Sequence, residues 1–320
     1  MQLPGLVSRF TVRFYVGITD FDWYSFLSGS ASLDEVNFWQ PSAGRRFKAL
    51  DPGGPFLFKL HSPRNYIVGG GFFGYYTTLP VSFAWKSFGI KNGAQSEQEM
   101  RTRLAKYRKV SPGSPEDYEI GCILLQSPFF LPEHEWIPAS DWEPNIVQGK
   151  TYDTADLRGQ ALWGQVQDWL TAYQAPALIL SGQTEEKAKR GGPQIVFPRL
   201  GQGTFRVVVA DAYKRRCAFT GSPVLHVLEA AHVRPVTSDG PNDVQNGILF
   251  RQDVHTLFDR GYITVTPDYR VEVSPRIKDE FENGKEYYSV HGKLITLPAQ
   301  ESLQPAAKFL SWHNENVYLG

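Results

Sequence analysis

Two histidines, an asparagine and an aspartate lie close together in the stretch EAAHVRPVTSDGPNDVQNGILFRQDVHTLFD, residues 229–259. His255 and Asp259 are four residues apart, so on a helix they share one face and can bind one cation. His232 ends a predicted strand over 224–233, and Asn246 lies where the next loop meets a predicted helix over 248–261. A histidine base, a cation site and an orienting amide form a minimal set for hydrolysing a phosphodiester.

The elements that must position these residues indicate an α+β protein. Apolar runs predict strands over 56–61, 66–76 and 121–130, and the three glycines of YIVGGGFFGYY predict a bulge in the second of these. Patterns typical of helices lie at 81–89, 95–109 and 205–217, and a further helix is predicted over 154–173, capped by Asp153 or Thr154. The polar segment 181–196 is interpreted as a linker, and 262–273 as a hairpin. The predicted domains are 1–150, 151–197 (helix and linker) and 198–320.

Composition sets limits on the protein class. The 320 residues are 42% apolar, which is enough for two ordinary domains, and most of the aromatic residues precede residue 175. The formal net charge is zero, so nucleic-acid binding would depend on local basic patches. Two cysteines, Cys122 and Cys217, exclude a disulfide framework and a cysteine-based zinc site. The N-terminus has no stretch typical of a signal peptide or membrane span, so we expect a cytoplasmic protein with no membrane partner.

The segment CAFTG…EAAHVRP…DGPNDVQNGILFRQDVHTLFDRG resembles the HNH nuclease family of the ββα-metal type. The resemblance implies that His232 is the general base, Asn246 the middle asparagine and His255 a ligand for a divalent cation such as Mg²⁺ or Mn²⁺. Asp259 stands where some members carry a further ligand. Many members have a ligand immediately before the base, where this chain has Ala231. Either Glu229, which projects from the same side of the strand, takes over this role, or a water molecule fills the position. Many members also bind zinc through two CxxC pairs; only Cys217 remains here, so no structural zinc is expected.

The N-terminal region resembles the PUA-like superfamily, in particular its EVE and YTH-like modules. The resemblance rests on NFWQPSAGRRFKALDPGGPFLFKLHSPRNYIVGGGFF, residues 37–73, and implies a β-barrel with helices that binds modified bases. A base turned out of the duplex would stack on aromatic rings and present its Watson–Crick edge to polar groups. The candidate pocket residues are Trp23, Asn37, Trp39, Phe72 and Phe73. The candidate contacts to the DNA backbone are Arg45, Arg46, Lys48, Lys214, Arg215 and Arg216.

A PUA-like reader fused to an HNH domain resembles modification-dependent restriction endonucleases of the type IV kind. The predicted function is therefore cleavage of double-stranded DNA that carries a modified cytosine, 5-methylcytosine or a relative. One HNH site cuts one strand, so a double-strand break would require a homodimer or sequential nicking. Three alternatives remain open: a nuclease triggered by phosphorothioate or hypermodified DNA, a non-catalytic module that binds modified nucleic acid, and an RNA-directed nuclease. Each residue also has a structural interpretation; Asp259, for example, could pair with Arg251 or Arg260.

Overall fold

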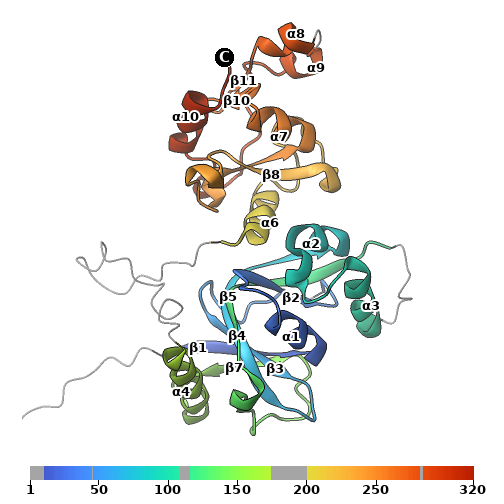
Figure 1. The fold of residues 1–320 in the computed structure, drawn as a ribbon, viewed down its shortest axis with the longest axis vertical. Helices are drawn as coiled ribbons and strands as arrows, with labels where there is room; N and C mark the ends of the chain where they lie inside the picture. The colour runs from blue at the N-terminus through green and yellow to red at the C-terminus, as the bar shows by residue number, and fades with distance from the viewer. Residues whose placement is uncertain (1–10, 45, 109–115, 174–199, 282–283) are drawn as a thin grey trace, which may run out of the picture. The chain divides into compact units, whose positions relative to one another are not determined.

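The computed structural model describes residues 11–44, 46–108, 116–173, 200–281 and 284–320. The chain divides into two compact units, Met1–Pro198 and Arg199–Gly320, each with its own internal packing (Figure 1). Both units combine helices with sheets, which confirms the α+β class. The predicted linker 181–196 lies outside the described residues. Among the described residues, no helix is long and apolar enough to cross a membrane.

The first unit is built on a seven-stranded sheet with the strand order β2-β5-β4-β3-β1-β7, in which β6 also pairs with β4. β1 and β3 run parallel, and the other pairs are antiparallel. The strands are β1 (Arg13–Thr19), β2 (Glu35–Gln40), β3 (Pro55–Leu60), β4 (Tyr66–Pro80), β5 (Glu119–Phe130), β6 (Ile137–Pro138) and β7 (Gly149–Asp153). The strands predicted over 56–61, 66–76 and 121–130 are therefore confirmed as β3, β4 and β5.

The predicted glycine bulge is present in β4. The pairing of β4 with β5 shifts register between Gly70 and Phe72, and again between Phe73 and Tyr75. Gly69 has φ +156°, and a Cβ there would lie 2.3 Å from the backbone oxygen of Phe129. Only glycine allows the two backbones to approach this closely. The bulges let one 15-residue strand bend within the sheet.

The helices of the first unit are α1 (Phe21–Ser28), α2 (Val81–Phe88), α3 (Glu97–Arg108) and α4 (Leu157–Ala172), with 3₁₀ turns η1 (Gly89–Asn92) and η2 (Glu133–Glu135). The predictions for α2 and α3 are confirmed. The predicted cap of α4 was wrong: Asp156 caps it, accepting a hydrogen bond from the Gly159 amide at 2.7 Å. Asp153 is instead the last residue of β7, and the Thr154 hydroxyl accepts a bond from the Val12 amide.

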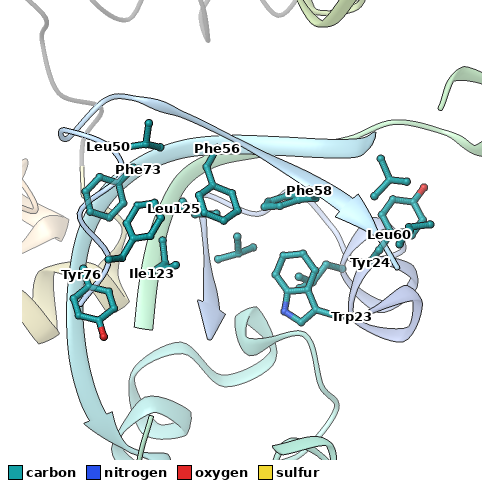
Figure 2. Packing of buried hydrophobic residues seen from close by; sticks show 14 residues of the cluster. Trp23, Tyr24, Leu50, Phe56, Phe58, Leu60, Phe73, Tyr76, Ile123 and Leu125 are labelled. Carbon is teal, nitrogen blue, oxygen red and sulfur yellow. The ribbon is translucent and has the colours of Figure 1, made fainter. Parts of the chain in front are cut away.

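Most of the aromatic excess forms the core of the first unit. Trp23, Phe56 and Phe58 are 3%, 0% and 0% exposed, and they pack with side chains from α1 and from four strands (Figure 2). Burying one such side chain stabilises a fold by about 1.5–3 kcal/mol. A second cluster joins Phe14 and Leu57 to Leu162, Val166 and Leu170 of α4. These clusters hold the sheet, α1 and α4 together.

The second unit contains a strand–strand–helix arrangement: β8 (Leu228–His232), β9 (Gly247–Arg251) and α7 (Gln252–Asp259). β8 and β9 pair antiparallel, with His232 opposite Gly247. The prediction of a helix over 248–261 was wrong for its first four residues, which belong to β9. Ile248, Leu249 and Phe250 are all buried, and a short apolar run buried on both faces has no periodicity that separates strand from helix. The strand predicted over 224–233 is shorter, because η3 (Leu225–Val227) precedes it.

Other elements surround this arrangement. α6 (Gln202–Ala212) packs on β8 and β9, and Gly247 permits the close approach, since a Cβ there would lie 2.5 Å from Val209 Cγ2. The hairpin predicted over 262–273 is confirmed as β10 (Ile263–Val265) and β11 (Val271–Val273). The remaining elements are α8 (Arg276–Phe281), α9 (Lys285–Tyr288), α10 (Ala307–Asn316) and the 3₁₀ turns η4 (Val236–Ser238), η5 (Val244–Asn246) and η6 (Glu301–Leu303).

A lysine lies in the interior of the first unit. Lys59 is 1% exposed; its ammonium donates to the Leu60 oxygen at 3.0 Å and to Asn65 Oδ1 at 2.7 Å, and lies 4.5 Å from the centre of the Trp142 ring. Burial lowers the pKa of Lys59 to about 8. Between pH 8 and the ordinary lysine pKa of 10.5, the unfolded chain therefore holds a proton that the folded chain has released.

The free energy of unfolding of the first unit should accordingly rise with pH, by about 2 kcal/mol between pH 8 and pH 10. Urea titrations followed by tryptophan fluorescence measure this, because seven of the eight tryptophans lie in the first unit: Trp23, Trp39, Trp85, Trp136, Trp142, Trp163 and Trp169. Lys59→Met should lack the rise. An equal rise in both proteins would contradict the assignment to Lys59.

Candidate active site and a second pocket

The β8–β9–α7 arrangement lines a pocket of about 510 Å³ in the second unit. His232 at the end of β8 and His255 and Asp259 on α7 all line it, as the sequence pattern predicts. The remaining lining comes from α6, β8, the loop after β8 and the C-terminal segment: Gln202, Phe205, Arg206, Glu229, Ala230, Pro235, Val236, Thr237, His313 and Val317. Histidine and carboxylate groups therefore converge on one open cavity.

His232 is held on two sides. Its ring stacks on Phe205 of α6, with centroids 4.0 Å apart and planes 13° apart. Its Nε2 lies 2.8 Å from Asn242 Oδ1, and the Asn242 amide group donates to the Leu200 oxygen at 2.9 Å. An amide oxygen only accepts, so His232 Nε2 carries the proton and donates it. In the neutral ring Nδ1 is then the basic nitrogen.

The surroundings of His232 favour the neutral form of its imidazole near neutral pH. Burial lowers the pKa of His232 below its ordinary value of 6.5, and the nearby charge of His255 acts in the same direction. The hydrogen bond to Asn242 and the charge of Asp259 oppose this shift without cancelling it. A neutral imidazole with a free lone pair on Nδ1 is the form that can accept a proton from water.

Asn246 does not line the pocket but fixes the loop that borders it. Its side chain is fully buried: Oδ1 accepts from the Arg234 amide at 2.8 Å, and Nδ2 donates to the oxygens of Arg234 and Pro241 at 2.9 and 3.0 Å. The loop that Asn246 closes leads directly into Asn242, the partner of His232. Asn246 ends η5 and precedes β9, so the predicted position at a loop-to-helix junction was wrong, because β9 lies between the loop and α7.

His255 lies between two carboxylates. Glu229 Oε2 is 2.9 Å from His255 Nδ1, and Asp259 Oδ2 is 3.2 Å from His255 Nε2. Burial raises the pKa of Asp259 above its usual range, an effect opposed by both histidines. A carboxylate on one nitrogen of a metal-binding histidine orients the ring and increases the basicity of the other nitrogen. Glu229 therefore contacts the Nδ1 side of the His255 ring, and Asp259 contacts its Nε2 side.

The position before the base is not part of the pocket. Ala231 is fully buried, whereas Glu229 and His232 on the same strand line the cavity. The Cys217 thiol is also buried, and it accepts from the amides of Thr220 and Arg251. Of the basic cluster that precedes it, Lys214 and Arg216 are exposed, while Arg215 Nε pairs with Asp211 Oδ1 at 3.0 Å. Two of these three predicted backbone contacts are therefore open to solvent.

The first unit contains a separate pocket of about 270 Å³ that brings together Trp23 and Trp39. The residues that share it are Ile18, Thr19, Asp20, Phe38, Gln40, Pro41, His61, Tyr107, Val147 and Gln148. Among the other predicted pocket residues, Asn37 is fully buried and donates to Asn92 Oδ1 at 2.9 Å. Asn37, and Phe72 and Phe73 of β4, do not line this pocket. Phe73 lines a different pocket.

That third pocket, about 420 Å³, contains Arg46 and Lys48, both exposed, beside Phe73, Tyr75 and Tyr76. The predicted contact Arg45 lies outside the described residues. The sequence did not predict Phe205 at the first pocket, Asn242 as the partner of His232, or Asp20, His61 and Tyr107 at the second pocket. The spacing of these residues in the sequence does not indicate a shared site, because each reaches its site through tertiary contacts. Only Asn242 lies within the 229–259 stretch that carries the two histidines.

Removing the Asn246 side chain should loosen the loop. Asn246→Ala leaves one amide and two carbonyls of the loop without this partner. An unsatisfied buried group costs about 1–3 kcal/mol, and these three groups are only partly buried, so we expect the low end for each and a loss of about 3 kcal/mol in all. Asn246→Asp cannot donate to either carbonyl and should also destabilise. Hydrogen exchange of peptides covering 233–242, together with urea unfolding, measures both effects. The matched control is Gln245→Ala; equal exchange in all three variants would disprove this role for Asn246.

Comparison with known proteins matches residues 217–266 to an HNH endonuclease family model. No curated protein matches the chain. Two solved structures of an ASCH protein from Zymomonas mobilis, one a mutant, are 11% identical to this chain. The mutant covers 48% of this chain and 95% of its own, with a TM-score of 0.32; the other covers 42% and 85%, with a TM-score of 0.28.

A structure described as a modification-dependent TagI restriction endonuclease is 11% identical, covers 94% of this chain and 81% of its own, and has a TM-score of 0.27. The family match spans Cys217, β8, β9, α7 and β10, and so includes every residue of the His232–Asn246–His255 set. Residues 217–266 of this chain are an HNH endonuclease domain, and the protein is a nuclease.

Proposed function

We propose that this nuclease is a modification-dependent DNA endonuclease, in which the first unit binds a modified cytosine turned out of double-stranded DNA and the second hydrolyses the backbone. The observation that supports the hydrolytic half is the convergence of His232, His255 and Asp259 on one 510 Å³ pocket within the HNH match. The recognition half is supported by the separate pocket that contains Trp23 and Trp39. Aromatic rings with a few polar groups are what an extruded base requires.

The proposed hydrolysis begins at His232. Its Nδ1 takes a proton from a water molecule, whose oxygen then attacks the phosphorus atom, and the bond from phosphorus to the leaving oxygen breaks. Asn242 holds the proton on Nε2, and Phe205 prevents rotation of the ring, so the same nitrogen always faces the reaction. Asn246 acts through the loop and touches no reacting atom.

The donor set of the pocket fits a divalent cation such as Mg²⁺ or Mn²⁺. His255 Nε2 and Asp259 would hold it, and Glu229 would orient His255 through Nδ1. Bound there, the cation would supply positive charge that stabilises the developing charge on the phosphate and leaving oxygen. Within the described residues no three His, Cys, Asp or Glu side chains enclose a metal site. Water and phosphate oxygens would therefore complete the coordination, as is usual for Mg²⁺.

DNA affinity is proposed to come from local cations. Lys214 and Arg216 are exposed shortly before the HNH motif, and Arg46 and Lys48 are exposed in the first unit. Because these contacts would neutralise phosphates, affinity should fall steeply with salt. One active site per chain cuts one strand, so a double-strand break would require two copies of the protein or two successive nicks.

A cleavage assay tests both halves of this proposal. Matched plasmids, unmodified and cytosine-methylated, are incubated with the protein in Mg²⁺, Mn²⁺ or EDTA. We expect cutting of the methylated plasmid only, dependent on the cation. His232→Ala should lower the rate by about 10²–10⁴-fold, since it removes the general base. The control His226→Ala alters an exposed histidine six residues earlier that does not line the pocket.

Other outcomes of this assay separate the alternatives. Cutting of both plasmids would keep the nuclease and exclude dependence on methylation. Cutting restricted to phosphorothioate or hypermodified plasmids would show that this modification, and not methylcytosine, triggers cleavage. Cutting of RNA alone would show that RNA, and not DNA, is the substrate. Binding of methylated DNA without cutting in any cation would leave a non-catalytic reader and refute the proposed reaction.

The pH dependence of cleavage should report on His232. Burial lowers the pKa of His232 below the ordinary value of 6.5, so the imidazole is still mostly neutral at pH 6.5. The cleavage rate should fall only when the pH drops through this lowered pKa. Asn242→Asp keeps an acceptor for Nε2–H but places a carboxylate beside the ring, which favours the protonated form. The acid limb of kcat/KM should then move to higher pH by about one unit or more. Identical profiles for the two proteins would contradict the assignment of His232 as the base.

A further inference from the structure

The pocket of the first unit contains a carboxylate with an unusual placement. Asp20 is the N-cap residue of α1, where an aspartate side chain normally accepts a hydrogen bond from the first turn of its helix. Its side chain makes no capping bond. Instead it lines the pocket with Trp23 and Trp39. The stabilisation that a cap provides, about 1 kcal/mol, is absent at this helix end.

Asp20 is held in this orientation from two distant parts of the chain. The Tyr107 hydroxyl on α3 donates to it, lying 2.7 Å from Oδ1 and 2.8 Å from Oδ2. His61, which directly follows β3, places Nε2 3.4 Å from Oδ1. A carboxylate has about four acceptor positions, so these two neighbours leave acceptor capacity for a ligand.

The other walls of the pocket suit a planar, aromatic ligand. Trp39 and Tyr107 stand edge to face with centroids 6.5 Å apart, and Trp39 is fixed by a bond from Nε1 to the Asn92 oxygen at 3.0 Å. Trp23 is 3% exposed and is fixed by edge contacts with Phe38 and Phe58. The volume of about 270 Å³ lies below the range of about 300–1,000 Å³ that is typical for drug-sized ligands, which suits one base and not a base pair.

We propose that Asp20 accepts a hydrogen bond from the exocyclic amino group of the extruded base, so that this pocket selects an amino-bearing base and rejects thymine and uracil. Cytosine presents an amino group on its pairing edge where thymine presents an oxygen. A carboxylate accepts from the amino group and repels the oxygen, since both would then be acceptors. This inference rests on the proposed reader function and adds the protein group that would recognise the base. Adenine also carries an exocyclic amino group, so it is the other base that this carboxylate could accept from.

5-Methylcytosine and thymine provide the decisive pair, because both carry the same methyl group and differ in the amino or oxo substituent. Full-length protein is titrated in EDTA, which prevents cutting, against labelled duplexes that differ at one position: C·G, 5-methylcytosine·G, a T·G mismatch and N6-methyladenine·T. Fluorescence anisotropy gives the Kd of each. The wild type should bind 5-methylcytosine about tenfold or more tighter than thymine in the mismatch.

Asp20→Asn is the main variant, because a carboxamide keeps an acceptor for Tyr107 and gains a donor for the thymine oxygen. The ratio between the two bases should fall to within about threefold, partly through tighter binding of thymine. Tyr107→Phe removes the anchor and should lower the ratio less. Asp22→Asn, on the exposed face of the same helix, is the matched control and should leave the ratio unchanged.

The outcomes distinguish this inference from the proposed function. If the wild type prefers 5-methylcytosine to thymine and Asp20→Asn keeps the same ratio, the role of Asp20 is refuted while the reader stands. If the wild type binds C·G and 5-methylcytosine·G equally, the modified-cytosine reader is refuted. A preference for N6-methyladenine that Asp20→Asn removes would support the amino-group chemistry with adenine as its source. Absence of binding to all four duplexes would overturn both proposals.

Discussion

The hydrogen bonds of the Asn246 side chain are the constraint on which the nuclease site depends. One buried amide satisfies the Arg234 amide and the carbonyls of Arg234 and Pro241, and so joins the two ends of the loop after β8. Asn242 follows Pro241 directly and bonds to His232, the proposed base. Asn246 therefore holds the loop that carries Asn242, and it is the contact with Asn242 that selects the tautomer of His232. An aliphatic side chain at position 246 would leave three partly buried polar groups of the loop without this partner, and only an amide both accepts from the Arg234 amide and donates to the two carbonyls.

The two histidines of the nuclease pocket, His232 and His255, lie in different environments. His232 is stacked on Phe205 and desolvated, and its pKa is lowered, which suits a base. His255 lies between the carboxylates of Glu229 and Asp259, which suits a cation ligand. The two elements that carry them, β8 and α7, are joined through β9, so the pairing of His232 with Gly247 also sets the position of α7. The proposed acid–base chemistry and the proposed cation binding thus fall on different histidines of one cavity.

The first unit uses a different principle: a rigid aromatic core that leaves a few polar groups at a pocket. Trp23 belongs both to that core and to the pocket lining. Asp20 is the N-cap residue of α1, the helix that carries Trp23, and Tyr107 and His61 hold its carboxylate at the pocket. Discrimination between bases of nearly equal shape requires such fixed hydrogen-bonding groups, because a methyl group alone contributes little selectivity.

The sequence by itself indicated the candidate residues of the nuclease site: His232, Asn246, His255 and Asp259 lie within 28 positions of one another on consecutive elements, and the spacing of four puts two of them on one helical face. It also indicated the α+β class and most elements of both units. Only the tertiary structure decided that 247–251 is a strand, that Asn242 and Phe205 hold the base, and that Asp20 meets Tyr107 across 87 positions. Local spacing determines what neighbouring residues share, whereas contacts between distant segments depend on how the whole core packs.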